Sequence, residues 1–216
     1  MKKLLYIMCN SKPEHASASK TVGREFVKRF MLKNPEYQLD ELDLYSADIP
    51  SLRSEYFGDR AKPVSGAAYQ ALGEDDKKAV DTIEQLSDQF LAADLYVIAA
   101  PMWSVSFPAK LKEYFDCVII QGKTIDVDPQ NNKVTGLLDD KERAMVYVQS
   151  SGGDFPMLLS SKLNHGITYT KDIFKFLGVK TFKKLLVEGT GDPEIGRDAA
   201  IQKAIGEIDD LVESLS

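Results

Sequence analysis

Residues 10–19 form a polar stretch, NSKPEHASAS, with hydroxyl groups at Ser11, Ser17 and Ser19. Apolar residues at helical spacing follow it, and we expect Ser19 to cap that helix. A helix N-terminus carries unpaired amide N–H groups and the positive end of the helix dipole, so it is a natural site for an anion. Together with the three hydroxyls, this stretch predicts a phosphate site. Helix capping without any ligand would account for the same serines.

A second stretch, Pro101 to Ser106, joins an apolar run to an amphipathic helix. Met102 and Trp103 offer apolar faces, the backbone amides around Ser104 and Val105 offer donors, and Pro101 stiffens the bend. This content suits a flat, partly polar ligand. An aromatic residue at a strand-to-helix bend also occurs in α/β proteins that bind nothing there.

A third stretch places two hydroxyl groups and two glycines, Ser150, Ser151, Gly152 and Gly153, directly after another apolar run. Paired glycines let the backbone approach a ligand closely. A simple tight turn is the alternative.

The apolar pattern predicts the elements that position these stretches. Buried or alternating runs predict strands at residues 4–9, 37–44, 95–100, 143–149 and 181–187. Helical spacing predicts helices starting at Ser19, spanning 74–92, following Pro108, spanning 158–177 and starting at Pro193, with Gly178 as the C-terminal cap residue of the fourth. Strand and helix therefore alternate five times.

This alternation predicts one α/β domain over residues 1–216, built on a doubly wound, five-stranded parallel sheet. The flavodoxin-like strand order 2-1-3-4-5 is the natural one for this count. Ligands of such sheets bind beyond the carboxyl ends of the strands, so the three stretches are predicted to meet in one crevice. A GxGxxG fingerprint is missing after the first strand, which argues against a dinucleotide-binding Rossmann domain.

Two segments lie outside the alternating pattern. Residues 122–136 are predicted to form a small β-hairpin around turn residues at 129–132. Residues 46–73 contain prolines, glycines and little periodicity, and they are predicted to be a lid or a subunit contact.

Composition argues against several classes of partner. The net charge is −6 without a concentrated basic stretch, so neither a nucleic acid nor an anionic membrane is an expected partner. The apolar run near the N-terminus is too short for a signal-peptide core or a membrane span. Two cysteines, Cys9 and Cys117, make no disulfide framework or zinc site, which favours the cytoplasm. No metal site is expected, and the two histidines, His15 and His165, receive no catalytic role.

The second stretch is the most specific feature of the sequence. It reads APMWSV at 100–105, and PAKLK at 108–112 and YFD at 114–116 follow it. With the serine loop and the glycine turn, it resembles the FMN-dependent NADH azoreductase and quinone reductase family of flavodoxin-like enzymes nearly end to end. The segments GKT at 122–124, Gly136-Leu137 and Glu188-Gly189 also resemble that family.

The resemblance implies bound FMN and a two-step (ping-pong) cycle. NADH or NADPH would pass a hydride to the flavin and leave, and a quinone or azo acceptor would then be reduced in the same pocket. The flavin carries the chemistry, so no catalytic side chain is assigned. The residues implied to hold FMN are Ser11, Ser17, Ser19, Pro101, Met102, Trp103, Ser104, Val105, Ser150, Ser151, Gly152 and Gly153.

The chain departs from the family pattern at four positions. The family's asparagine after the aromatic residue is Ser104, the arginine of its glycine turn is Ser151, and the aromatic pair of its hairpin is Ile125 and Val127. These changes affect what the resemblance implies about substrate binding more than what it implies about FMN binding. The expected substrate contacts are Trp103, Ile125, Val127, Asp154 and Phe155.

The resemblance also implies a homodimer with the flavin sites at the subunit interface. Residues 46–73, the hairpin and the helix after Pro108 are the candidate contacts, and Trp103 is a candidate to be shared across the interface.

Three other functions fit the same fold. A non-enzymatic flavodoxin-type electron carrier would resemble others in a T/S-x-T-G-x-T phosphate loop, which residues 10–19 do not match. A response-regulator-like switch needs an aspartate where this chain has Ala99-Ala100-Pro101. A family member that has lost its flavin and serves as a binding protein stays open because of Ser104 and Ser151.

Overall fold

The computed structural model describes residues 1–59, 61–153 and 163–215. Its helices and strands are β1 (Lys2–Met8), η1 (Glu14–Ala16), α1 (Ala18–Lys33), β2 (Tyr37–Asp43), η2 (Ser54–Tyr56), β3 (Phe57–Asp59), β4 (Lys62–Pro63), α2 (Gly66–Gln70), α3 (Glu74–Ala92), β5 (Leu95–Pro101), α4 (Ala109–Val118), β6 (Ile125–Asp128), β7 (Lys133–Gly136), β8 (Ala144–Ser150), α6 (His165–Leu177), β9 (Thr181–Val187), α7 (Arg197–Gly206) and α8 (Ile208–Glu213).

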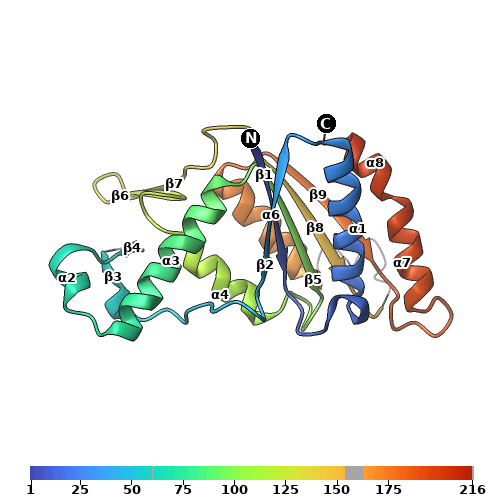
Figure 1. The fold of residues 1–216 in the computed structure, drawn as a ribbon, viewed down its shortest axis with the longest axis horizontal. Coiled ribbons are helices and arrows are strands. Elements are labelled where there is room, and N and C mark those ends of the chain that lie inside the picture. Colours follow the sequence, from blue (N-terminus) through green and yellow to red (C-terminus); the bar gives the residue numbers. More distant parts are fainter. Residues whose placement is uncertain (60, 154–162, 216) are drawn as a thin grey trace.

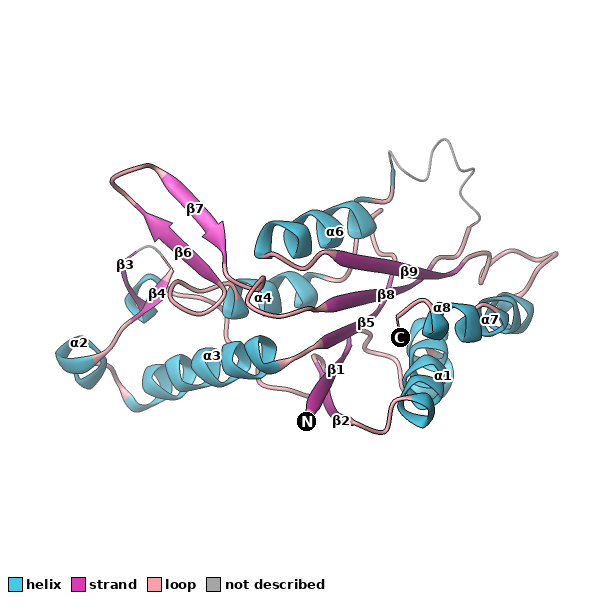
Figure 2. Cartoon of the chain, turned by 90° about the horizontal axis from the view of Figure 1, so that it is seen from above, coloured by secondary structure: helices cyan, strands magenta, loops and turns pink. Residues whose placement is uncertain are grey.

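A five-stranded parallel sheet forms the centre of the molecule, in the order β2-β1-β5-β8-β9 (Figure 1). This confirms the predicted flavodoxin-like order. Helices α3, α4 and α6 cover one face of the sheet, and α1, α7 and α8 cover the other (Figure 2). In the described part of the chain, no helix is long and apolar enough to cross a membrane.

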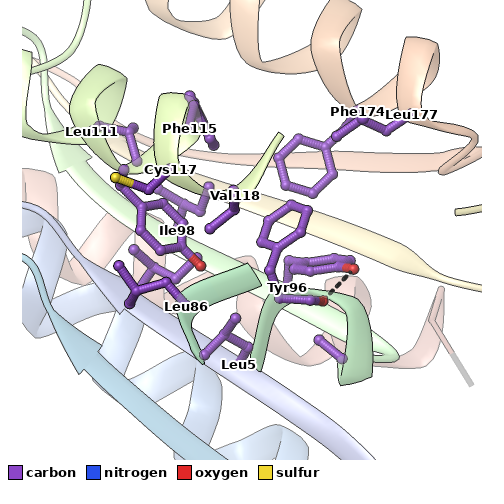
Figure 3. Packing of buried hydrophobic residues seen from close by; sticks show 14 of the residues in the cluster. Leu5, Leu86, Tyr96, Ile98, Leu111, Phe115, Cys117, Val118, Phe174 and Leu177 are labelled. Atoms are coloured by element: carbon purple, nitrogen blue, oxygen red, sulfur yellow. Dashed lines mark hydrogen bonds between the residues drawn. The ribbon is translucent and has the colours of Figure 1, made fainter. Parts of the chain in front are cut away.

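Burial explains why the central strands are apolar throughout. All seven residues of β5 are buried, because helices pack on both faces of the sheet. One core cluster lies under α3, α4 and α6 and includes Tyr96 and Phe174, which are labelled in Figure 3, together with Phe90, whose ring is tilted against both. A second cluster lies under α1, α7 and α8 and includes Phe26 and Phe30.

A glycine in α1 allows that helix to lie close to the sheet. A Cβ atom on Gly23 would lie 2.7 Å from the hydroxyl oxygen of Tyr6 and 3.0 Å from the Cβ of Ala99. The Tyr6 hydroxyl donates a 3.0 Å hydrogen bond to the carbonyl of Lys20 in the first turn of the helix. The N-terminus of α1 is thereby held at the carboxyl edge of the sheet.

Both segments outside the alternating pattern have regular structure. The predicted hairpin is present as β6 and β7, and it packs against the C-terminal end of α6, where the Leu138 amide donates to the Leu177 carbonyl at 2.7 Å. Residues 46–73 contain η2, the small antiparallel pair β3-β4 and α2. Tyr56 anchors this segment, because its side chain is buried in the first core cluster.

Two predicted helix starts differ from the structure, and a third lies outside the described residues. Ser17, not Ser19, caps α1, because the Ser17 side chain accepts a hydrogen bond from the Lys20 amide. The last helix begins at Arg197, since the Asp192 carboxylate accepts the amides of Glu194 and Ile195 and turns the chain after Pro193. The fourth predicted helix is described only in part: 154–162 lie outside the described residues, and α6 ends at the predicted cap, Gly178, with φ of 109°.

Tyr114 supports a test of core energetics. Its hydroxyl is fully buried and has no hydrogen-bond partner in the described chain, and burial raises the pKa of the phenol well above its usual value. Removing an unsatisfied buried polar group removes its desolvation cost. We therefore expect Tyr114→Phe to raise the free energy of unfolding by about 1 kcal/mol in urea titrations. Tyr96→Phe, which loses a 2.9 Å bond to the Phe90 carbonyl, should lower it; a loss of stability in both variants would contradict the assignment.

Candidate functional site

The three polar stretches lie side by side at the carboxyl edge of the sheet, which is the lower edge in Figure 1. Backbone hydrogen bonds between neighbouring parallel strands continue past the strand ends and hold the three stretches at this edge. The Cys9 amide donates to the Ala99 carbonyl at 2.8 Å, and the Met102 amide donates to the Ser150 carbonyl at 2.7 Å. The structure thus joins the ends of β1, β5 and β8.

The serine loop forms a polar cradle at the start of α1. The Ser17 hydroxyl accepts from the Asn10 side-chain amide at 2.9 Å and lies 3.3 Å from the Ser19 hydroxyl. Among the described residues, the amides of Ala18 and Ser19 donate no hydrogen bond. Asn10 was not predicted as a site residue. Its position, directly after a buried strand and before the serines, is the sequence feature that could have indicated it.

A partly buried ion pair fixes the other side of the serine loop. Lys20, whose side chain is 4% exposed, contacts the Asp43 carboxylate at 2.7 Å and donates to the Lys12 carbonyl at 3.1 Å. Asp43 ends β2, so the lysine ties the loop to a neighbouring strand. Ser11 lies in this loop and is exposed.

The stretch after β5 is a tight turn with an unusual backbone. Trp103 and Ser106 exchange two backbone hydrogen bonds, of 3.0 and 2.8 Å, while Ser104 and Val105 between them have φ of 48° and 57°. Positive φ at both central residues defines a type I′ turn, which usually contains asparagine and glycine. In the described structure, the amides of Ser104 and Val105 have no acceptor, so they are available to a ligand.

Exposed aromatic surface flanks this turn. Trp103 is 43% exposed, and the ring of Tyr45 lies edge-on to it with 6.5 Å between the ring centroids. Tyr45 lies two residues after the end of β2 and was not predicted as a site residue. The mouth of the site therefore offers an apolar, aromatic wall.

The glycine turn after β8 is open on one side and supported on the other. A Cβ atom added to Gly152 or Gly153 would meet no described residue within 4 Å. From the opposite side, the Thr190 amide donates to the Ser151 carbonyl and the Gly191 amide donates to the Gly152 carbonyl, at 3.0 and 2.9 Å. This support by the loop after β9 leaves the glycine backbone accessible to a ligand.

Some of the predicted substrate contacts lie elsewhere. Ile125 is 7% exposed and packs in the core, and Val127 is half-buried on the same hairpin, which lies against the C-terminal end of α6 (Figure 2). Within one chain they do not line the crevice. Asp154 and Phe155 lie outside the described residues.

The two cysteines do not provide a nucleophile. Burial raises the pKa of the Cys9 thiol to about 12, although that residue follows β1 at the edge of the site. Burial likewise raises the pKa of Cys117 to about 12, and the thiol of Cys117 donates to the Pro50 carbonyl. Both thiols stay protonated at neutral pH.

A cavity of about 760 Å³ lies at the opposite, amino-terminal edge of the sheet. Its lining mixes charges of both signs, and several are already paired: Lys141 contacts Asp94 at 2.7 Å, and Lys2 lies over the ring of Tyr37. Because this mixture favours no ligand of one charge, the carboxyl edge is the stronger candidate site.

Comparison with known proteins agrees with this fold. The family model described as "Flavodoxin-like fold" matches residues 2–212, so the chain is a flavodoxin-like protein. It is 52% identical to "FMN-dependent NADH:quinone oxidoreductase 1" of Clostridium acetobutylicum over 215 residues, covering 100% of this chain and 96% of the relative. A relative from Clostridium botulinum named "FMN-dependent NADH:quinone oxidoreductase" is 50% identical, with 100% of both chains covered.

Among solved structures, an FMN-dependent NADH-azoreductase from Bacillus anthracis in complex with FMN superposes with a TM-score of 0.83 and 22% identity, covering 99% of each chain. The chain belongs to the FMN-dependent NADH azoreductase and quinone reductase family, as its sequence motifs predicted.

Proposed function

We propose that this protein is an FMN-dependent NAD(P)H oxidoreductase that reduces quinones and azo compounds. One observation carries the proposal: two sets of backbone amides that have no acceptor among the described residues, at the start of α1 and in the 103–106 turn, lie at the same strand edge beside an exposed tryptophan. The first set suits a phosphate and the second suits the polar rim of a flat ring. Relatives named as FMN-dependent NADH:quinone oxidoreductases, about half identical over the whole chain, support the same function.

The serine cradle is assigned to the FMN phosphate. Ser11, Ser17 and Ser19 would supply hydroxyl donors, and the dipole of α1 would favour the negative charge. Lys20 adds a positive charge nearby. The Asp43 carboxylate neutralises much of that charge, so the main role of Lys20 is to hold the loop in place.

The turn and the glycine segment are assigned to the ring. Residues 101–105 would fix its plane, and residues 150–153 would meet its polar edge through backbone donors. When bound, FMN supplies the hydride chemistry, from NADH or NADPH to a quinone or azo acceptor. Backbone donors that point at the ring's polar edge would already be in place before the reaction. They would therefore stabilise the negative charge of the reduced ring without a rearrangement of the protein.

Substrates are assigned to the exposed side of Trp103, where the aromatic wall would exclude water and stack a planar molecule. One pocket of this kind serves the nicotinamide donor and the acceptor in turn. Asp154 and Phe155 stay proposed contacts on this side. Ile125 and Val127 would reach a flavin only from a second subunit, because their hairpin lies away from the crevice of its own chain.

We further propose a homodimer, in the cytoplasm. The hairpin residue Val134 is 47% exposed and the nearby α6 residue Phe176 is 44% exposed, so an apolar surface adjoins the predicted contacts. The two free cysteines support a reducing compartment.

The first test is a visible absorption spectrum of the purified protein under anaerobic conditions. A bound-flavin spectrum is expected to bleach on addition of NADH or NADPH and to recover with a quinone. A flavin spectrum that neither donor changes would favour the electron carrier. A colourless protein that takes up no added FMN would overturn the proposal and favour the flavin-less binding protein.

Gly152→Leu tests the assignment of the glycine turn. No described residue comes within 4 Å of a Cβ atom at this position, so the variant should fold normally, while its side chain would occupy the place assigned to the ring. We expect it to lose FMN on purification, with unchanged circular dichroism. Gly206→Leu is the matched control, since it also meets nothing within 4 Å but lies at the end of α7. Wild-type flavin occupancy in Gly152→Leu would exclude a close approach there.

Sedimentation of the flavin-loaded protein tests the dimer, with an expected mass of about twice 24.0 kDa. Val134→Asp should weaken the association by placing a charge in an apolar contact. Leu32→Asp, on the exposed side of α1, is the control and should not. A monomer at all concentrations would contradict the proposed assembly.

A further inference from the structure

The 103–106 turn adopts its conformation against the preference of its residues. Ser104 and Val105 both have positive φ, and valine is β-branched, so its side chain disfavours the left-handed region strongly. A conformation of this kind persists only where the surrounding structure holds it. The contacts that hold the turn are therefore of functional interest.

The first turn of α6 provides those contacts. The His165 amide donates to the Val105 carbonyl at 2.9 Å. Gly166 comes so close that a Cβ atom there would lie 3.1 Å from the carbonyl carbon of Ser106 and 2.8 Å from the side-chain nitrogen of Gln149. The start of α6 thus rests directly on the far side of the turn.

A buried pair of side-chain amides fixes the start of α6 to the sheet. Asn164 is 5% exposed and Gln149, near the end of β8, is 2% exposed. The Asn164 amide group donates to the Gln149 side-chain oxygen, and the Asn164 oxygen caps α6 by accepting the Ile167 amide at 3.1 Å. The Gln149 amide group in turn donates to the hydroxyl of Tyr147 at 3.4 Å. Buried polar groups linked in this way define one geometry, because breaking a bond leaves its partner unsatisfied.

We propose that Asn164 and Gln149 are positioning residues for the flavin turn: their amide pair fixes the start of α6 on β8, and α6 holds Ser104 and Val105 in the strained conformation that presents their amides. The consequence for FMN affinity rests on the proposed function. The consequence for the turn itself does not, because it concerns the free protein alone.

Asn164→Ser is the appropriate variant. Serine also caps helices, so the start of α6 is preserved, but the amide pair with Gln149 is lost. Asn34→Ser is the matched control: Asn34 ends α1 and donates to the Phe30 carbonyl at 2.9 Å, far from the site. Hydrogen exchange of the apoprotein should show faster exchange of the Trp103 and Ser106 amides in Asn164→Ser and no change there in Asn34→Ser. Unchanged exchange in both variants would overturn the proposal, whether or not the protein binds FMN.

Titration of the apoproteins with FMN provides the second measurement. We expect the dissociation constant of Asn164→Ser to rise about tenfold, as the loss of one buried hydrogen bond would produce, and that of the control to stay within about twofold. Val105→Gly relieves the strain, so in that background Asn164→Ser should raise the dissociation constant by less than about threefold. An equal increase in both backgrounds would show that Asn164 does not act through the turn. Failure of the wild-type protein to bind FMN would count against the proposed function alone.

Discussion

The candidate site depends on the parallel register between β5 and its two neighbours. Met8 pairs with Ala99 and Pro101 pairs with Ser150, so the strands β1, β5 and β8 end together. Because side chains alternate along a strand, a shift of one residue would exchange the two faces of β5 and break its packing against the helices on both sides. Burial on both faces prevents this shift. The hydrophobic core thus determines where the three polar stretches meet.

This dependence explains which features the sequence could predict. Fully apolar runs such as Leu95 to Ala100 require helices on both sides, and their alternation with helical segments leaves few possible topologies. Strand order, hairpin and the meeting of the loops followed from that pattern. The sequence does not identify the residue at which α1 starts, because the side chains of Ser17 and Ser19 have the same capping chemistry. The one-turn helix at Glu14–Ala16 leads the chain into α1 at Ser17, and propensity alone does not select it.

The conformation of the 103–106 turn could not be predicted, because its sequence argues against it. Serine and valine are poor choices for a type I′ turn, and the stabilising contacts come from α6, about sixty residues later in the chain. Tyr45 is a similar case: nothing in its local sequence indicates that its ring packs against Trp103. Local pattern predicts the elements, whereas contacts between distant segments determine the details of the site.

Helix α6 is anchored at both ends, and this gives it a mechanical property. Its first turn rests on Val105 and Ser106, and its last turn contacts the hairpin through Leu177 and Gly136. A helix of this length is roughly 20 Å long and behaves as a stiff rod. A displacement of the hairpin would therefore be transmitted along the helix axis to the far end, with little loss to bending. One helix thus connects the hairpin at one end of the sheet to the strained 103–106 turn at the other.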